Sequence, residues 1–100
     1  MINLQHKRIT IIGGKRSGMA LAELIVKSGG RAKLSENGSR DSLPNEFLGW
    51  AEENKLELEF NGHTRKFIQE SDVVVLSPGV RIDSMPVEWA KEHKIPVLGE

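Results

Sequence analysis

A glycine-rich segment near the N-terminus has the residue types of an anion-binding turn. Residues 13–18 read Gly-Gly-Lys-Arg-Ser-Gly and lie between an apolar β-branched run and a stretch with helical spacing. Glycine permits a tight turn, and the first N–H groups of the following helix point outward at the positive end of the helix dipole. A serine hydroxyl and basic side chains can add to such a site. We therefore predict that a phosphate group is bound by Gly14, Lys15, Arg16, Ser17 and Gly18.

This segment matches the G-x-G-x-x-G fingerprint of nucleotide-binding turns only in part. Gly13 and Gly18 fit, but Lys15 stands where the middle glycine is expected. Either Gly14 provides the close approach, or Lys15 tolerates the required backbone angle with its side chain turned outward. A plain strand-to-helix turn with exposed bases is the alternative. The Walker A pattern G-x-x-x-x-G-K-[ST] does not occur in the sequence, so we expect no ATP site of that kind.

Two further polar segments follow apolar runs. Glu36, with Asn37 beside it, comes about 20 residues after the first glycine, where dinucleotide-binding domains carry an acidic residue. Its carboxylate could accept hydrogen bonds from a ribose hydroxyl or a base N–H; a solvated loop acid is the alternative. Ser77, Pro78 and Gly79 follow the most apolar run and predict a turn whose amides and hydroxyl could meet a ligand.

The elements that would position these segments alternate between strand and helix. Apolar runs predict strands over residues 8–12, 31–35, 56–60, 72–76 and 95–98, and helical spacing predicts helices over 17–28, 47–54, 64–71 and 86–93. Alternation of this kind favours a parallel sheet covered on both faces. We expect one Rossmann-like three-layer α/β domain with a five-stranded parallel sheet over residues 1–100. Ligands of such sheets bind beyond the carboxyl ends of the strands, where all three polar segments fall.

Composition excludes several classes of function. The 14 basic and 14 acidic residues balance to a net charge of zero, so we expect neither nucleic acid nor a membrane surface as a partner. The absence of cysteine excludes disulfides and thiolate metal sites, and with no signal-like segment it is typical of a cytoplasmic protein. His6, His63 and His93 lack the spacing of a metal site.

Taken together, the segments resemble the N-terminal domain of the Mur ligases, in particular the MurD family that adds D-glutamate to UDP-N-acetylmuramoyl-L-alanine. The resemblance is carried by residues 11–20, 35–37, 61–63 (Asn-Gly-His), 72–80 and 95–100, and so covers essentially the whole chain. The sequence Ser-Pro-Gly-Val at residues 77–80 best distinguishes the MurD family from the sister ligases that add L-alanine, because those typically have a Ser-Ser-Ala-like sequence there.

The resemblance implies a domain that binds the UDP part of the substrate and does not take NAD. Carried over by position, the diphosphate would lie on Arg16–Gly18, the uracil on Glu36–Asn37, and the rim of the pocket on Ser77 and Gly79. The family usually has Asp-Ser/Thr-Arg where this chain has Glu-Asn-Gly at residues 36–38, so the arginine is missing. We hypothesise that Lys15, which replaces a glycine, compensates for that charge.

The reaction that the resemblance implies needs more than one domain. ATP would phosphorylate the muramoyl-alanine carboxylate, and the amine of D-glutamate would displace the phosphate to form an amide. ATP and magnesium would be bound by central and C-terminal ligase domains outside these residues, so we expect no cofactor in this domain and no activity of the domain alone. The competing interpretations are an NAD- or FAD-binding Rossmann domain, and an α/β interaction domain that binds no nucleotide.

Overall fold

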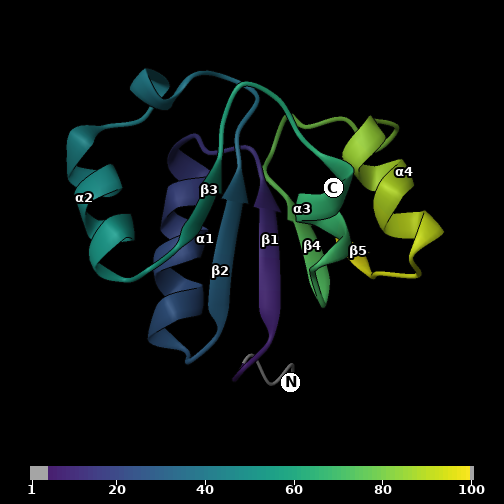
Figure 1. The fold of residues 1–100 in the computed structure, drawn as a ribbon, viewed down its shortest axis with the longest axis horizontal. Helices are drawn as coiled ribbons and strands as arrows, with labels where there is room; N and C mark the ends of the chain where they lie inside the picture. Colours follow the sequence, from purple (N-terminus) through teal and green to yellow (C-terminus); the bar gives the residue numbers. More distant parts are fainter. Residues whose placement is uncertain (1–4, 100) are drawn as a thin grey trace.

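The computed structural model describes residues 5–99 and shows a parallel sheet of five strands in the order β3-β2-β1-β4-β5 (Figure 1). Residues 1–4 and Glu100, the ends of the expected 1–100 domain, lie outside the described residues. The strands are β1 (Arg8–Ile12), β2 (Arg31–Ser35), β3 (Glu57–Glu59), β4 (Val73–Leu76) and β5 (Val97–Leu98). The predicted α/β Rossmann-like sheet is confirmed, with β3 and β5 at its two edges.

The strand order reverses next to β1. From β1 the chain moves outward to β2 and then to β3, and it returns to place β4 on the other side of β1. Ile12 at the end of β1 pairs with Ser35 of β2 on one side and with Leu76 of β4 on the other. The loops that follow these strands therefore diverge to opposite faces and leave room between them, which is where open α/β sheets bind ligands.

Helices cover both faces of the sheet, as its side-chain alternation requires. Their bounds are α1 (Arg16–Lys27), α2 (Asn45–Glu53), α3 (Arg65–Gln69) and α4 (Met85–Glu92), with a short 3-10 turn at Arg40–Ser42. On one face Ile9 and Ile11 pack with residues of α1 and α2; on the other Ile12 packs with residues of α3 and α4. Figure 1 shows α2 and α4 at opposite sides of the molecule, with the loops that follow β1 and β2 along its upper edge.

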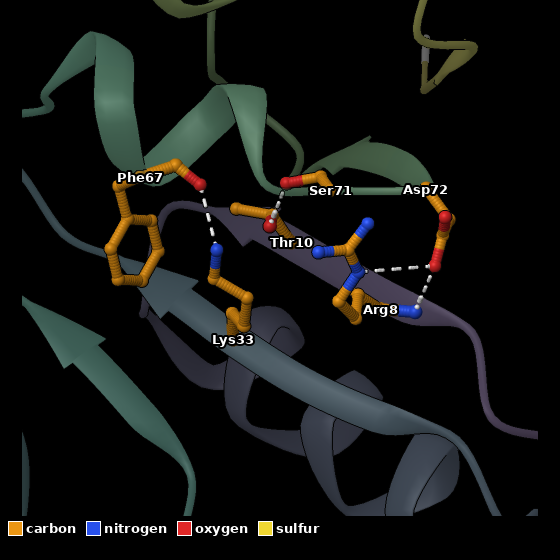
Figure 2. A network of polar contacts seen from close by, with 6 residues as sticks. All are labelled: Arg8, Thr10, Lys33, Phe67, Ser71 and Asp72. Atoms are coloured by element: carbon orange, nitrogen blue, oxygen red, sulfur yellow. Dashed lines mark hydrogen bonds and ion pairs between the residues drawn. The ribbon is translucent and has the colours of Figure 1, made fainter.

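The short helix α3 is held to the sheet by buried polar contacts (Figure 2). Lys33 of β2 is almost fully buried, and its Nζ donates to the Phe67 carbonyl at 2.7 Å and lies 4.3 Å from the Phe67 ring centre. Burial lowers the pKa of Lys33. Beside it, the buried hydroxyls of Thr10 and Ser71 are hydrogen-bonded to each other. These contacts fix α3, and with it the loop that enters α3 from β3.

Candidate functional site

A cleft of about 510 Å³ lies at the carboxyl ends of the strands, at the reversal of strand order. Six of the predicted site residues line it, and they come from all three polar segments: Lys15, Glu36, Asn37, Ser77, Pro78 and Gly79. The lining also includes residues that the sequence did not single out as ligand contacts: Ile12, Gly13, Gly38, Ser42, His63 and Val80. The fold thus brings together segments that lie more than 60 residues apart.

The β1–α1 turn reaches the cleft without a glycine at position 15. Gly13 has a φ of +97°, which only glycine adopts readily, and a Cβ there would lie 3.0 Å from the side chain of Val80. Lys15 has φ −69° and ψ −171°, an extended conformation open to any residue. Lys15 is exposed and lines the cleft, so its ammonium can stay near a bound anion without backbone strain.

Gly18 allows α1 to pack directly on the turn. A Cβ on Gly18 would lie 2.1 Å from the carbonyl oxygen of Gly13, a separation that no structure tolerates. This is the role of the third glycine of the nucleotide-binding fingerprint, close packing of helix on strand. This packing places the N-terminus of the 12-residue helix α1 beside the cleft. The side chain of the N-cap residue, Lys15, makes no capping hydrogen bond with the first N–H groups of the helix.

Glu36 joins two loops rather than extending into solvent. Its side chain is 9% exposed; Oε1 accepts from the backbone N–H of Gly14 and Oε2 from that of Gly38, both at 2.6 Å. The carboxylate therefore fixes the β1–α1 turn against the loop after β2. Carboxylate oxygens have further lone pairs, so Glu36 can still accept from a ligand. Its first task is to shape the wall of the cleft.

The segment after β4 forms the opposite wall. Val80 N–H donates to the Ser77 carbonyl at 3.1 Å, with Pro78 and a Gly79 of φ +93° between them, which is a type II turn. The Ser77 hydroxyl donates to the Gly13 carbonyl at 2.7 Å, and so ties this turn to the β1–α1 turn. Its hydrogen is committed to that bond, and a ligand would meet the Ser77 oxygen as an acceptor or the exposed backbone of Pro78 and Gly79.

Four predicted site residues do not line the cleft. Gly14 and Gly18 are buried behind its wall, where they shape it. Ser17 is exposed in the first turn of α1. Arg16 lines a separate hollow between α1 and α2, together with Phe47 and Trp50. The predicted diphosphate contacts were Arg16, Ser17 and Gly18. Only the backbone N–H groups of these residues, at the start of α1, are directed to the end of the helix beside the cleft.

His63 is the titratable side chain among the lining residues that the sequence did not predict as ligand contacts. Histidine spacing indicates a site only where several histidines lie together, whereas His63 is the one histidine in the loop between β3 and α3. The available signal was its position: Asn61-Gly62-His63 follows a strand, as the other three polar segments do. Burial lowers the pKa of His63, while Glu59 and Glu36 act to raise it. The shift favours the neutral imidazole at pH 7.

Comparison with known proteins identifies the family. The family model of the MurD N-terminal domain matches residues 8–85. The UDP-N-acetylmuramoylalanine–D-glutamate ligase of Salinibacter ruber is 37% identical over 97% of this chain, and that of Pelotomaculum thermopropionicum is 35% identical over 95%. The chain spans about a fifth of the length of these relatives, 20% and 21% respectively.

Solved structures show the same fold. The UDP-N-acetylmuramate-alanine ligase MurC of Thermotoga maritima superposes with a TM-score of 0.73 and 20% identity over 94% of this chain and 21% of its own. SirC, a precorrin-2 dehydrogenase, gives a TM-score of 0.69 with 12% identity over 97% of this chain and 46% of its own. Within residues 5–99 no helix is both long and apolar enough to cross a membrane. The match of the MurD family model to most of the sequence is decisive: the chain belongs to the MurD N-terminal domain family.

Proposed function

We propose that this domain binds the uridine diphosphate part of UDP-N-acetylmuramoyl-L-alanine in the cleft at the reversal of strand order. The observation that carries the proposal is the convergence, in a member of the MurD N-terminal domain family, of Lys15, Glu36 and the Ser77–Gly79 turn on one cleft beside the N-terminus of α1. The diphosphate would lie toward Lys15 and α1, where the positive charge is. The nucleoside would lie toward Glu36, Asn37 and His63, which offer mostly hydrogen-bond acceptors.

The domain would serve a ligase whose other parts carry the chemistry. In that reaction ATP transfers a phosphoryl group to the alanyl carboxylate, and the amine of D-glutamate then displaces phosphate to form the amide. The relatives named for this activity are about five times as long as this chain, which leaves room for domains that bind ATP, magnesium and D-glutamate. We propose that the domain anchors the substrate in the cytoplasm and has no activity alone.

Affinity for the isolated nucleotide is expected to be modest. Three to five charge-assisted hydrogen bonds of roughly 1.5–3 kcal/mol each stand against an association cost of ~4–15 kcal/mol. The balance lies near micromolar to millimolar dissociation constants or weaker. Isothermal titration calorimetry of the 100-residue chain with UDP-N-acetylmuramoyl-L-alanine, UDP and NAD measures the three affinities and tests the proposal. The proposal predicts binding of both uridine compounds and none of NAD; binding of NAD in preference to UDP would replace it with a dinucleotide-binding function.

A further inference from the structure

The side chain of His63 has one ring nitrogen fixed by a buried hydrogen-bond chain. Ser35 of β2 is fully buried, and its Oγ donates to Oε1 of Glu59 at 2.6 Å. The same Oγ lies 2.6 Å from Nδ1 of His63. A serine hydroxyl has one hydrogen and a carboxylate can only accept, so that hydrogen belongs to Glu59. Ser35 therefore accepts from His63, and Nδ1 carries the imidazole hydrogen.

The acceptor role of Glu59 is supported by its other partners. Oε1 of Glu59 also accepts from the backbone N–H of Thr64 at 3.1 Å, and Oε2 accepts from the Thr64 hydroxyl. In each of these hydrogen bonds the carboxylate of Glu59 acts as the acceptor. The tautomer of His63 follows: Nδ1 is protonated, and Nε2 holds a lone pair as long as the ring is neutral.

The loop that carries His63 is held at both ends. Asn61 N–H donates to the Gly38 carbonyl at 2.9 Å, which fixes the loop to the segment after β2. Thr64 caps α3 by accepting from the backbone N–H of Phe67 at 3.4 Å, and α3 is itself fastened to Lys33 (Figure 2). The imidazole is thus preorganised in the wall of the cleft before any ligand arrives.

The surroundings of His63 suit a neutral acceptor and not a phosphate-binding cation. The carboxylates of Glu59 and Glu36 are the charged groups that act on its ring, and burial outweighs them, so its pKa stays below the ordinary 6.5. Lys15, from the β1–α1 turn, lines the same cleft and adds positive charge. Lys15 stands at the N-cap of α1, whereas His63 stands in the β3–α3 loop, which Asn61 joins to Gly38.

We infer that His63 determines specificity for the nucleoside end of the ligand: its Nε2 accepts a hydrogen bond from an O–H or N–H donor, either the 2′-hydroxyl of the ribose or the imide N–H of uracil. The inference rests on the proposed function and adds to it a residue that reads the nucleoside. Ser35 and Glu59 act through His63 as positioning residues, because they hold the tautomer that leaves Nε2 free to accept.

The test compares the unmodified chain and three variants of it with three ligands. His63→Leu removes the acceptor, His63→Gln restores an amide acceptor near the position of Nε2, and His93→Leu is a matched control on an exposed histidine at the end of α4. Titration calorimetry measures their affinity for UDP, for 2′-deoxy-UDP and for N3-methyl-UDP. For UDP we expect His63→Leu to weaken binding about 3- to 15-fold, with His63→Gln and His93→Leu close to the unmodified chain.

The analogues separate specificity from a structural role. The analogue that lacks the donor read by His63 should bind the unmodified chain and His63→Leu equally, whereas the other analogue should keep the full difference. An equal loss for all three ligands, or no loss for UDP, would overturn the inference and leave the proposed function standing. Failure of the unmodified chain to bind UDP would instead defeat the proposed function, and the inference with it.

The pH profile gives a readout that needs no analogue. Protonation turns Nε2 from an acceptor into a donor, so UDP affinity of the unmodified chain should fall relative to His63→Gln as the pH drops below the pKa of the imidazole. Titration of the UDP phosphates affects both proteins and cancels in the ratio. A ratio that stays constant as the pH passes through the pKa of His63, located by imidazole NMR titration, would contradict an acceptor role for His63.

Discussion

At the scale of single residues, most polar side chains in the cleft both line it and shape its wall through hydrogen bonds within the protein. Glu36 holds two backbone N–H groups and Ser77 holds a carbonyl, so each shapes the cleft wall that it also lines. The sequence identified both residues by their place after a strand, but their protein partners could not be inferred, because Gly14 and Gly13 reach them only through the packed sheet. Replacing such a residue should therefore change stability as well as binding.

Glu36→Gln tests this double duty. A glutamine can present one acceptor oxygen, and its NH₂ would face one of the two backbone N–H groups, so we expect a loss of about 1–3 kcal/mol in the free energy of unfolding. Urea denaturation measures it. Glu52→Gln, on the exposed side of α2, is the matched control and should leave stability within about 0.5 kcal/mol. Equal stability of the two variants would show that the Glu36 hydrogen bonds contribute nothing net.

Lys15 provides a second prediction at this scale. The structure gives it no backbone strain and places it in the cleft, in keeping with the hypothesis that it replaces the arginine missing after Asn37. Lys15→Met should weaken UDP binding about two- to fivefold, as expected for an exposed ion pair, and the loss should shrink at high salt. Lys27→Met, at the far end of α1, should not weaken it. Unchanged affinity of Lys15→Met would end the compensation hypothesis.

His63 makes stability depend on pH with a defined sign. The pKa of His63 in the folded protein lies below the 6.5 of an unperturbed imidazole, so the unfolded chain binds a proton there that the folded protein does not. The free energy of unfolding therefore decreases as the pH falls from 6.5 to the pKa of the folded state. Unfolding free energies at about pH 7.5 and about pH 5.5 should differ less for His63→Gln than for the unmodified chain. An imidazole NMR titration of His63 with a midpoint above 6.5 would contradict this assignment.

At the scale of elements, glycines in helices show how packing decides what a residue does. Gly18→Ala would place a Cβ against the Gly13 carbonyl and should destabilise the fold by about 1–3 kcal/mol, since α1 must move off β1. Gly49→Ala in α2 meets nothing within 4 Å and should stabilise it by about 0.5–1 kcal/mol. Thermal unfolding of both variants gives the two signs, and a stable Gly18→Ala would refute the close contact.

The sequence predicted elements best where local pattern and packing agree. β1 and β2 have the predicted bounds, since each is a short run ended by glycine or polar residues. The last strand was predicted over residues 95–98 but is Val97–Leu98, because Pro96 lacks an N–H to donate to a strand ladder. The third strand was predicted over residues 56–60 and is Glu57–Glu59, as an edge strand pairs with one neighbour only. The ends of these two strands are set by backbone pairing, which the side-chain pattern does not predict.

At the scale of the whole molecule, the site exists because the strand order reverses. Segments after β1, β2, β3 and β4 supply the cleft, and none of them could form it alone. Sequence reasoning located three of these segments from the general rule for parallel sheets. The fourth, with His63, follows β3 and so falls under the same rule, but the contacts of the β3–α3 loop with Gly38 and Ser35 are tertiary and no local pattern encodes them.

The most direct test of the account is an amide NMR titration of the chain with UDP, with NAD titrated in parallel, both to millimolar concentration. The account predicts that UDP shifts the resonances of Gly13, Lys15, Asn37, His63 and Gly79 together, and that NAD does not. Control amides in α4 and β5 should stay in place. Shifts of the cleft residues with NAD but not with UDP would contradict the central claim that this cleft binds a uridine diphosphate group.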